Sequence, residues 1–234
     1  MKKVPFFIIG LISILLASCS SINLVNESSY YNSDRKTDTV KMFARKEKIN
    51  HKGKRIGDFV LSEHNSDDWS KIRLKLEKFA KSNGANIIEF DKIGPRIDAN
   101  RFHADGSLYF VENIDSVSAK KEEKCHFNFI RDYNEGLLGS FFDIDIKVDD
   151  KMYKDLKSNA LISHEVANCK NDVLVTINNI EHKINFDGKS KYFMLSNNKL
   201  GLSPYGISIS FNNVIINEIN DEELGKFIFY QFKK

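Results

Sequence analysis

The side chains that most often do chemistry in proteins are spread along this chain of 234 residues without forming a recognisable catalytic motif. The histidines are His51, His64, His103, His126, His164 and His182. None belongs to an HxxxH or HxH pair, so no zinc site is predicted. His64 near Asp67 and Asp68 could touch a metal, but acidic residues just before a helix are typical of capping. No serine lies in a GxSxG motif. The sequence therefore predicts no cofactor, no metal and no enzymatic activity.

The acidic segment FDIDIKVDD, residues 142–150, suggests a second chemistry, because carboxylate oxygens bind calcium. Its acids alternate with apolar residues, so they share one face of a strand. They cannot wrap an ion as a loop with a sharp glycine turn does. We interpret the segment as a strand with one solvated face, in which Ile144, Ile146 and Val148 face the core.

The N-terminus has the composition of an export signal. Two lysines follow Met1, and the run from Val4 to Ala17 is almost wholly apolar. This run is shorter than the ~20 residues that a membrane-spanning helix needs, and it ends in small residues, as secretory signals do. The residues Leu16-Ala17-Ser18-Cys19 resemble the lipobox of bacterial lipoproteins.

The lipobox resemblance implies that residues 1–18 are removed and that Cys19 carries acyl chains. Two or three chains hold a protein on a membrane, whereas one chain holds it only marginally. Ser20 follows the cysteine in place of Asp, which among Gram-negative lipoproteins implies delivery to the outer membrane. We therefore expect a protein anchored to the cell outer membrane through lipid on Cys19 and facing the periplasm.

The other two cysteines, Cys125 and Cys169, form an even pair in an oxidising compartment. A disulfide between them would stabilise the fold by roughly 4 kcal/mol in the chain-entropy model. The alternative is two reduced thiols that are buried separately. Neither cysteine belongs to a CxxC motif, so no redox-catalytic role is predicted.

Composition indicates a folded protein with no preference for nucleic acid. Hydrophobic residues make up 41% and charged residues 29% of the chain, and the formal net charge is +3. Lysines and acids are interleaved, so no basic stripe indicates a nucleic-acid partner. The remaining partner classes are the membrane, an envelope protein and the cell wall.

The first half of the mature chain predicts a tether and then a small α+β domain. Residues 19–50 are rich in Ser, Asn and Tyr, which indicates a lipidated cysteine followed by a tether. Within residues 51–115, helical spacing predicts a helix over Trp69–Asn83 between strands at Arg55–Glu63 and Asn86–Lys92, a βαβ-type unit. The spacing buries Ile72, Leu76 and Phe79 and exposes Lys71, Lys75 and Lys78.

The segment NGANIIEF, which ends this helix and begins the next strand, resembles an element of small bacterial envelope proteins. Those proteins include an outer-membrane lipoprotein sensor of the Rcs stress pathway and small heavy-metal-binding domains. The resemblance covers about Trp69 to Phe90. It implies no metal site here, because no Cys or His lies within the helix or the strand after it.

Residues 116–124 are polar and charged and predict a linker to a second domain, an antiparallel β-sandwich over residues 125–234. Short alternating runs separated by Gly, Asn and Asp indicate its strands, and KFIFYQF near the C-terminus is predicted as one of them. Arg131 and Asp132 at a strand end are predicted to form an ion pair or a turn. Residues 125–195 resemble a β-sandwich family of bacterial lipoproteins, which implies a fold and a compartment but no reaction.

Three functions follow as hypotheses. The first is a non-catalytic envelope lipoprotein that acts as a tethered interaction or structural module. The second is a carrier for a small or saccharide ligand, held by aromatic residues between the two domains. The third is a hydrolase, which requires ionisable groups with shifted pKa values in one cleft. We expect most of the C-terminal aromatic residues to be core residues: Tyr192, Phe193, Phe227, Phe229, Tyr230 and Phe232.

Overall fold

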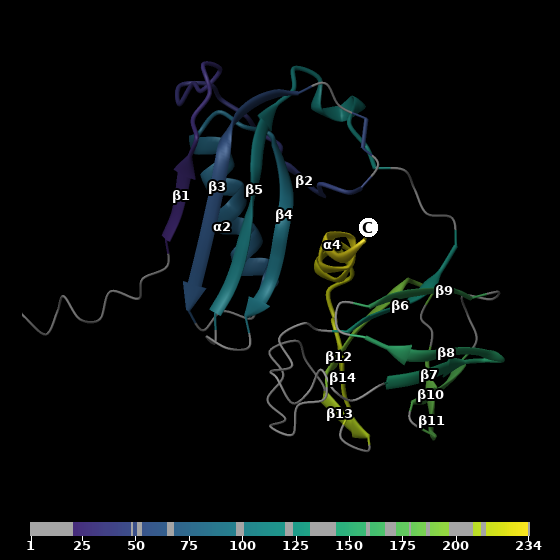
Figure 1. Cartoon of the computed structure of the whole chain (residues 1–234). Coiled ribbons are helices and arrows are strands. Elements are labelled where there is room, and N and C mark those ends of the chain that lie inside the picture. Colours follow the sequence, from purple (N-terminus) through teal and green to yellow (C-terminus); the bar gives the residue numbers. More distant parts are fainter. Residues whose placement is uncertain are drawn as a thin grey trace, which may run out of the picture.

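The computed structural model describes residues 21–47, 49–50, 53–64, 68–96, 101–119, 124–131, 144–157, 160–166, 172–177, 179–185, 188–196, 208–211 and 214–233. These residues form an α+β protein with three sheets and two α-helices (Figure 1). Two of the sheets pack as a β-sandwich, and the third packs against both helices. The fold class predicted from the sequence is therefore confirmed.

Sheet A has five strands in the order β1–β3–β5–β4–β2. They are β1 (Ser21–Val25), β2 (Lys41–Ala44), β3 (Lys54–His64), β4 (Ile87–Arg96) and β5 (Arg101–Phe110). Only β2 and β4 are parallel neighbours. The predicted βαβ unit is present but split, because β5 forms a hairpin with β4 and lies between β3 and β4.

Helix α2 (Trp69–Ser82) begins at the predicted residue and ends one residue earlier than predicted, because Asn83 is its C-cap. The side chain of Asp68 caps its first turn by accepting a hydrogen bond from the Lys71 backbone N–H. Beyond its end, Gly84 has a φ of 68°, which glycine adopts without steric cost. Ile72 and Leu76 are fully buried against sheet A. The three lysines are exposed, as predicted, whereas Phe79 is only partly buried.

The prediction of a tether over residues 19–50 is wrong for residues 21–47. Ser21–Val25 is strand β1, which pairs with β3 along its whole length. The segment that follows is fixed to the domain by backbone hydrogen bonds, such as Ser28 N–H to the Ile56 carbonyl and Lys41 N–H to the Asn86 carbonyl. Ile22 and Leu24 alternate toward the core and supply the burial that holds this polar segment in place.

The sandwich consists of two sheets. Sheet B has the order β11–β10–β7–β8, and sheet C the order β13–β14–β12–β6–β9. The strands are β6 (His126–Arg131), β7 (Ile144–Val148), β8 (Lys151–Leu156), β9 (Leu161–Glu165), β10 (Val173–Ile177), β11 (Ile180–Ile184), β12 (Lys191–Ser196), β13 (Ser208–Phe211) and β14 (Val214–Glu218). Ile144, Ile146 and Val148 are fully buried between the sheets, as their alternation predicts.

The sandwich is not purely antiparallel, because β6 and β12 pair in parallel. The chain forms the whole of sheet B between these two strands and so re-enters sheet C in the direction of β6. Phe127, Phe129 and Phe193 stack across this pair, with ring centroids 5.3–6.2 Å apart. The parallel pair therefore carries a stack of three phenylalanine rings in the sandwich core.

The prediction of a C-terminal strand at KFIFYQF is also wrong, because Glu222–Phe232 is helix α4. The Asp221 side chain accepts a hydrogen bond from the Leu224 backbone N–H at 3.0 Å and caps the first turn. The aromatic residues have high strand propensity, but tertiary packing outweighs propensity here. Three of them, Phe227, Phe229 and Tyr230, are buried together with Tyr192 of β12 in one cluster with sheet A.

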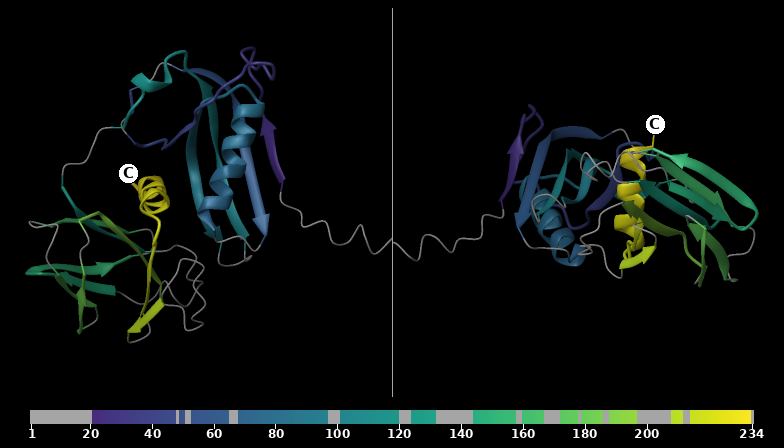
Figure 2. Two further views of the ribbon diagram at one scale, coloured as in Figure 1. Left: turned by 180° about the vertical axis from the view of Figure 1, so that it is seen from behind. Right: turned by 60° about the horizontal axis from the view of Figure 1, so that its bottom comes forward.

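Helix α4 joins the two halves of the protein. It lies at the β4 edge of sheet A, where its side chains meet the core between α2 and the sheet, and it also contacts β12 of the sandwich (Figure 2). The Phe227 ring lies 5.0 Å from that of Phe90 in β4 and 6.0 Å from that of Trp69 in α2. The Gln231 side chain exchanges two hydrogen bonds with the Ile93 backbone, at 3.0 and 2.9 Å. The last helix of residues 125–234 therefore completes the core of the N-terminal sheet.

Candidate functional site

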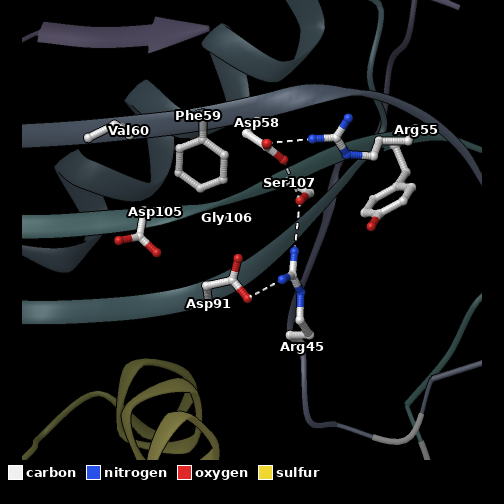
Figure 3. A pocket seen from close by; sticks show the side chains of 10 residues that line it. Arg45, Arg55, Asp58, Phe59, Val60, Asp91, Asp105, Gly106 and Ser107 are labelled. Atoms are coloured by element: carbon white, nitrogen blue, oxygen red, sulfur yellow. Dashed lines mark hydrogen bonds and ion pairs between the residues drawn. The ribbon is translucent and has the colours of Figure 1, made fainter. Parts of the chain in front are cut away.

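The face of sheet A opposite α2 carries an open polar hollow of about 460 Å³ (Figure 3). Its charged and polar lining residues are Arg45, Arg55, Asp58, Asp91, Asp105 and Ser107, and Tyr109 also lines it. We call this set the polar hollow. It draws on β3, β4, β5 and the residue that follows β2, so it depends on the strand order of sheet A.

Strand alternation explains why these side chains share one face. In β5, Ala104 and Leu108 are fully buried against the helices, so Asp105 and Ser107 point to the other side. A register shift in β4 between Phe90 and Lys92 leaves Asp91 as an extra residue opposite β5.

The β4 bulge also explains why residue 106 in β5 is a glycine. A Cβ atom at Gly106 would lie 1.9 Å from the Glu89 carbonyl oxygen, so only glycine fits where β5 passes the bulge. The close approach of the two strands brings Asp91 next to the side chains of β5.

Five side chains of the polar hollow form a continuous network (Figure 3). Arg55 forms an ion pair with Asp58, whose other oxygen accepts a 2.7 Å hydrogen bond from the Ser107 hydroxyl. Arg45 donates to the same hydroxyl at 2.8 Å. Its other terminal nitrogen lies 2.7 Å from Asp91. Each guanidinium and carboxylate in the network is thus oriented by at least one neighbour.

The surroundings of the carboxylates shift their pKa values in opposite directions. Burial and the nearby carboxylates of Asp105 and Asp58 raise the pKa of Asp91, although Arg45 opposes the shift. Burial also disfavours the charge of Asp58, but hydrogen bonds from Asn26, Ser107 and Arg55 outweigh burial and lower its pKa. Asp91 is therefore easier to protonate than Asp58.

The Tyr109 phenol has a raised pKa, because of burial and the nearby Glu89 charge. It therefore keeps its proton at neutral pH and can donate a hydrogen bond. Arg45 and Arg55 expose 49% and 40% of their side chains, so both can reach a ligand from solvent. The polar hollow combines donors and acceptors in fixed positions.

Ser107 is not arranged as a nucleophile. Its hydroxyl donates to Asp58 and accepts from Arg45, and the imidazole of His103 in the same strand pairs with Asp105, at 2.9 Å. An activated serine needs a base that accepts its proton, and the lowered pKa of Asp58 makes that carboxylate a weak base. The geometry suits binding better than acyl transfer.

The sequence-predicted site residues lie elsewhere. Cys19 and Cys169 fall outside the described residues. Cys125 is buried and directly precedes β6, and its carbonyl accepts a 2.9 Å hydrogen bond from the Val166 backbone N–H. Arg131 is fully buried and donates to the Leu156 carbonyl of β8, whereas Asp132 lies outside the described residues.

A second polar cluster bridges the sandwich sheets. The Tyr153 hydroxyl of β8 lies 3.0 Å from His164 Nδ1 of β9, and Asp149 lies 4.0 Å from His164 Nε2. Burial lowers the pKa of His164 despite the neighbouring carboxylate of Asp149. The sequence did not predict that these residues are neighbours. They meet because β8 and β9, which belong to different sheets, pack against each other across the sandwich.

Sequence reasoning missed every polar residue of the hollow. A signal was present, since Asp105 and Ser107 alternate with apolar residues in HADGSLYF. Alternation identifies a wet face but does not say which strands are neighbours. Three residues of the network, Arg45, Asp58 and Asp91, come from different strands or from a strand end, and only the sheet order joins them.

The described residues offer neither a metal site nor a membrane-spanning helix. No group of three or more His, Cys, Asp or Glu side chains there could hold a metal ion. No helix within the described ranges is long and apolar enough to cross a membrane. The resemblances to a lipobox, to an envelope element and to a lipoprotein β-sandwich stay predictions. No family model, curated protein or solved structure matches this chain significantly.

Proposed function

We propose that this chain is a lipid-anchored protein of the bacterial cell envelope that binds a partner without transforming it. The polar hollow on sheet A is its recognition surface in this proposal. The observation that carries the proposal is the connected network of ion pairs and hydrogen bonds on a sheet face that neither helix covers. Surface ion pairs add little to stability, so a fixed network of this size is better explained by recognition.

The chemistry of the hollow favours a charged or strongly polar partner. Arg45 and Arg55 can each present a planar fork of donors to a carboxylate or phosphate. The carboxylates of Asp91 and Asp105 can accept hydrogen bonds from amines, amides or hydroxyls. An envelope protein or a cell-wall polymer offers such groups.

The anchor proposal rests on the sequence of residues 1–19, in which a short apolar run ends at Leu16-Ala17-Ser18-Cys19. The expected location is the outer membrane, with the folded part in the periplasm. Replacing Cys19 by Ala should move the protein from the membrane fraction to the soluble fraction or leave it unprocessed. An unchanged membrane fraction and an unchanged mature mass would contradict the anchor.

Photo-cross-linking in living cells tests the recognition surface. A cross-linking amino acid at Val60, which lines the hollow and is exposed, should capture one defined partner. Arg45→Ser should abolish this product, because it removes the guanidinium that links Ser107 and Asp91. The same cross-linker at Leu174, an exposed residue of β10, is the matched control. Equal products from both positions, or a product that Arg45→Ser leaves intact, would contradict the proposal.

A saccharide is the second candidate ligand, and the hollow favours it over the space between the two halves. Tyr192, Phe227 and Phe229 are buried core residues there and offer no platform to a sugar. In the hollow, carboxylates and guanidinium groups can pair with sugar hydroxyls, which are both donors and acceptors. Calorimetric titration with soluble cell-wall glycan fragments would test this, with Asp91→Asn as the variant expected to weaken binding.

One observation also favours a hydrolase, the third hypothesis. Asp91 has a raised pKa and Asp58 a lowered pKa within one hollow, and paired acids of this kind can act as acid and base. The hollow is open to water and Asp58 is fully engaged, so we rank this function below binding. If the native protein releases reducing ends from a cell-wall glycan and Asp91→Asn does not, hydrolysis would replace binding as the better-supported function.

We also propose a disulfide between Cys125 and Cys169. The Val166–Cys125 backbone hydrogen bond places residue 166, which is close in sequence to Cys169, beside Cys125. A bridge requires Cα atoms roughly 4.4–6.8 Å apart. Mass spectrometry of the unreduced protein should find a peptide that joins the two cysteines. Two alkylatable thiols would contradict the bridge.

A further inference from the structure

Strand β2 ends beside the polar hollow, and helix α4 takes its place at the edge of β4. The last pair between β2 and β4 joins Ala44 to Phe90. Further along β4, the side-chain amide of Gln231 donates to the Ile93 carbonyl at 2.9 Å and accepts from the Ile93 N–H at 3.0 Å. One amide group thus satisfies both backbone groups of the strand edge, as a neighbouring strand would.

The contacts with α4 lie on both sides of the bulge that carries Asp91. Before the bulge, the Phe90 ring packs against that of Phe227, with centroids 5.0 Å apart. After the bulge, Ile93 is held by Gln231. Figure 3 shows α4 next to this part of β4. The helix therefore fixes the backbone from which Asp91 enters the hollow.

Helix α4 also holds the turn that carries Arg45. This turn, residues 44–47, is closed by a 2.9 Å hydrogen bond from the Glu47 N–H to the Ala44 carbonyl. The Glu47 carboxylate accepts a hydrogen bond from the Ala44 N–H and forms an ion pair with Lys226 of α4. Only 3% of the Glu47 side chain is exposed, so its charge depends on this partner. The position of the turn is thereby tied to α4.

The two hollow residues that α4 holds in this way form one ion pair. A terminal nitrogen of Arg45 lies 2.7 Å from Asp91, and the same guanidinium donates to Ser107 of β5. Charge-assisted hydrogen bonds are strong only when donor and acceptor are close and aligned. A shift of α4 along the edge of β4 would therefore disturb both partners of the pair and the network beyond it.

The other side of α4 is fixed to the sandwich. A Cβ atom at Gly225 would lie 2.7 Å from the ring of Tyr192 in β12, so the helix and the strand are in direct contact. The Phe229 ring lies 6.1 Å from the same tyrosine ring. The Ile219 N–H, shortly before the helix, donates to the Tyr192 carbonyl at 2.9 Å. The position of α4 on sheet A therefore depends on the sandwich.

We propose that Lys226 and Gln231 are positioning residues of the polar hollow, through which the C-terminal half of the chain controls recognition. With α4 in place at the edge of β4, Arg45 and Asp91 keep the geometry that a partner contacts. When α4 moves away, they lose it. By thermodynamic linkage, a partner bound in the hollow stabilises the docked helix by the same factor. This inference rests on the proposed recognition function of the hollow.

The pKa of Asp91 reports the position of Arg45 without any ligand. Burial and the carboxylates of Asp105, Asp58 and Glu89 raise this pKa, whereas the guanidinium of Arg45 lowers it. These acids face Asp91 from β5, β3 and β4, and Arg45 faces it from the end of β2. NMR titration of the full-length protein with isotope-labelled aspartate carboxyl groups measures the pKa. The Asp91 signal is identified by its absence in Asp91→Asn.

Two sets of substitutions test the positioning role. Glu47→Gln with Lys226→Met, the ion-pair variant, removes the pair without leaving a buried charge and keeps an oxygen for the hydrogen bond inside the turn. It should raise the pKa of Asp91 by about 0.5 pH unit or more, because an adjacent cation lowers a carboxylate pKa by about 1–3 units. Gln231→Ala, at a partly exposed position, should raise it as well. Lys226→Arg keeps the ion pair and should leave the pKa as it is in the native protein.

Glu223→Ala is the matched control on the same helix. Glu223 accepts a hydrogen bond from the Trp69 indole at 3.1 Å and lies 3.5 Å from Arg73, so it holds α4 to α2 and not to β2 or β4. The pKa of Asp91 should not change in this variant. An unchanged pKa in the ion-pair variant or in Gln231→Ala would overturn the role of the residue replaced. An equal rise in Glu223→Ala would overturn both roles.

Cross-linking in cells separates this inference from the proposed function. With the cross-linker at Val60, the ion-pair variant should give at least about twofold less product than the native chain, since coupling between two sites is typically severalfold. Glu223→Ala should give the native amount. A product that the ion-pair variant leaves intact would overturn the control of recognition. If the native chain gives no product while the pKa of Asp91 responds as expected, the recognition function fails and the positioning role stands.

Discussion

Truncation of Phe227 to Ala should destabilise the N-terminal sheet from the opposite end of the chain. The ring is 2% exposed and meets two aromatic neighbours, Phe90 at 5.0 Å and Trp69 at 6.0 Å. Removing a buried phenylalanine ring costs about 3–5 kcal/mol, and the loss of two aromatic contacts favours the upper end of this range. A domain of ordinary stability holds about 5–15 kcal/mol, so the variant should be close to unfolding.

The chain offers a direct assay for this change, because Trp69 is the only tryptophan. Its indole N–H donates to Glu223 of α4 at 3.1 Å, so its fluorescence reports the contact between α2 and α4. Urea unfolding followed by this fluorescence and by circular dichroism should show a lower midpoint for Phe227→Ala. Leu174→Ala, at an exposed position of β10, should change the free energy of unfolding by less than about 0.5 kcal/mol. A cost below about 1 kcal/mol for Phe227→Ala would refute the shared core.

Four further predictions concern single sites. Leu76→Ala should cost about 2–5 kcal/mol in urea unfolding, since Leu76 is fully buried, and a cost under half a kcal/mol would mean that the face of α2 is not packed. Asp221→Ala should cost about 0.5–2 kcal/mol and lower the helix content of α4 in circular dichroism, whereas unchanged stability would rule out the cap. Gly106→Ala should lower the melting temperature, because the added Cβ atom would collide with the Glu89 carbonyl oxygen at the β4 bulge. An unchanged melting temperature would show that the backbone at the bulge can shift to make room for it. Burial lowers the pKa of His164, so between the unfolded and the folded pKa the unfolded chain binds a proton that the folded chain does not. The free energy of unfolding should therefore fall as the pH drops from about 6.5 toward the folded pKa. His164→Gln should reduce this pH dependence, and an unchanged pH dependence would contradict the lowered pKa of His164.

Local signals were sufficient for most of the elements. Helix α2 is predictable because its cap at Asp68, its apolar spacing and Gly84 all lie within the helix or directly next to its ends. Strand β1 carries a signal as well, since Ile22 and Leu24 alternate in SINLV, but the surrounding Ser and Asn residues indicated a tether. In that case composition was a poorer guide than periodicity.

Helix α4 could not be read from its composition. Its aromatic residues favour strands, and its apolar surface is too wide for an ordinary amphipathic helix because it is covered by sheet A on one side and by β12 on the other. The acids Glu222 and Glu223 after Asp221 were the available signal for a helix start. Burial between two sheets, which no local window contains, explains the wide apolar surface.

The sequence alone determined the α+β class, the position of α2 and the inward faces of strands such as β7, because each follows from residues that are neighbours along the chain. The tertiary structure decided that β5 separates β3 from β4, that α4 returns to the first sheet and that Arg45, Asp58 and Asp91 share one hollow. Such contacts join segments that are far apart in sequence. They depend on which apolar faces bury each other best, and that choice is made by the whole fold at once.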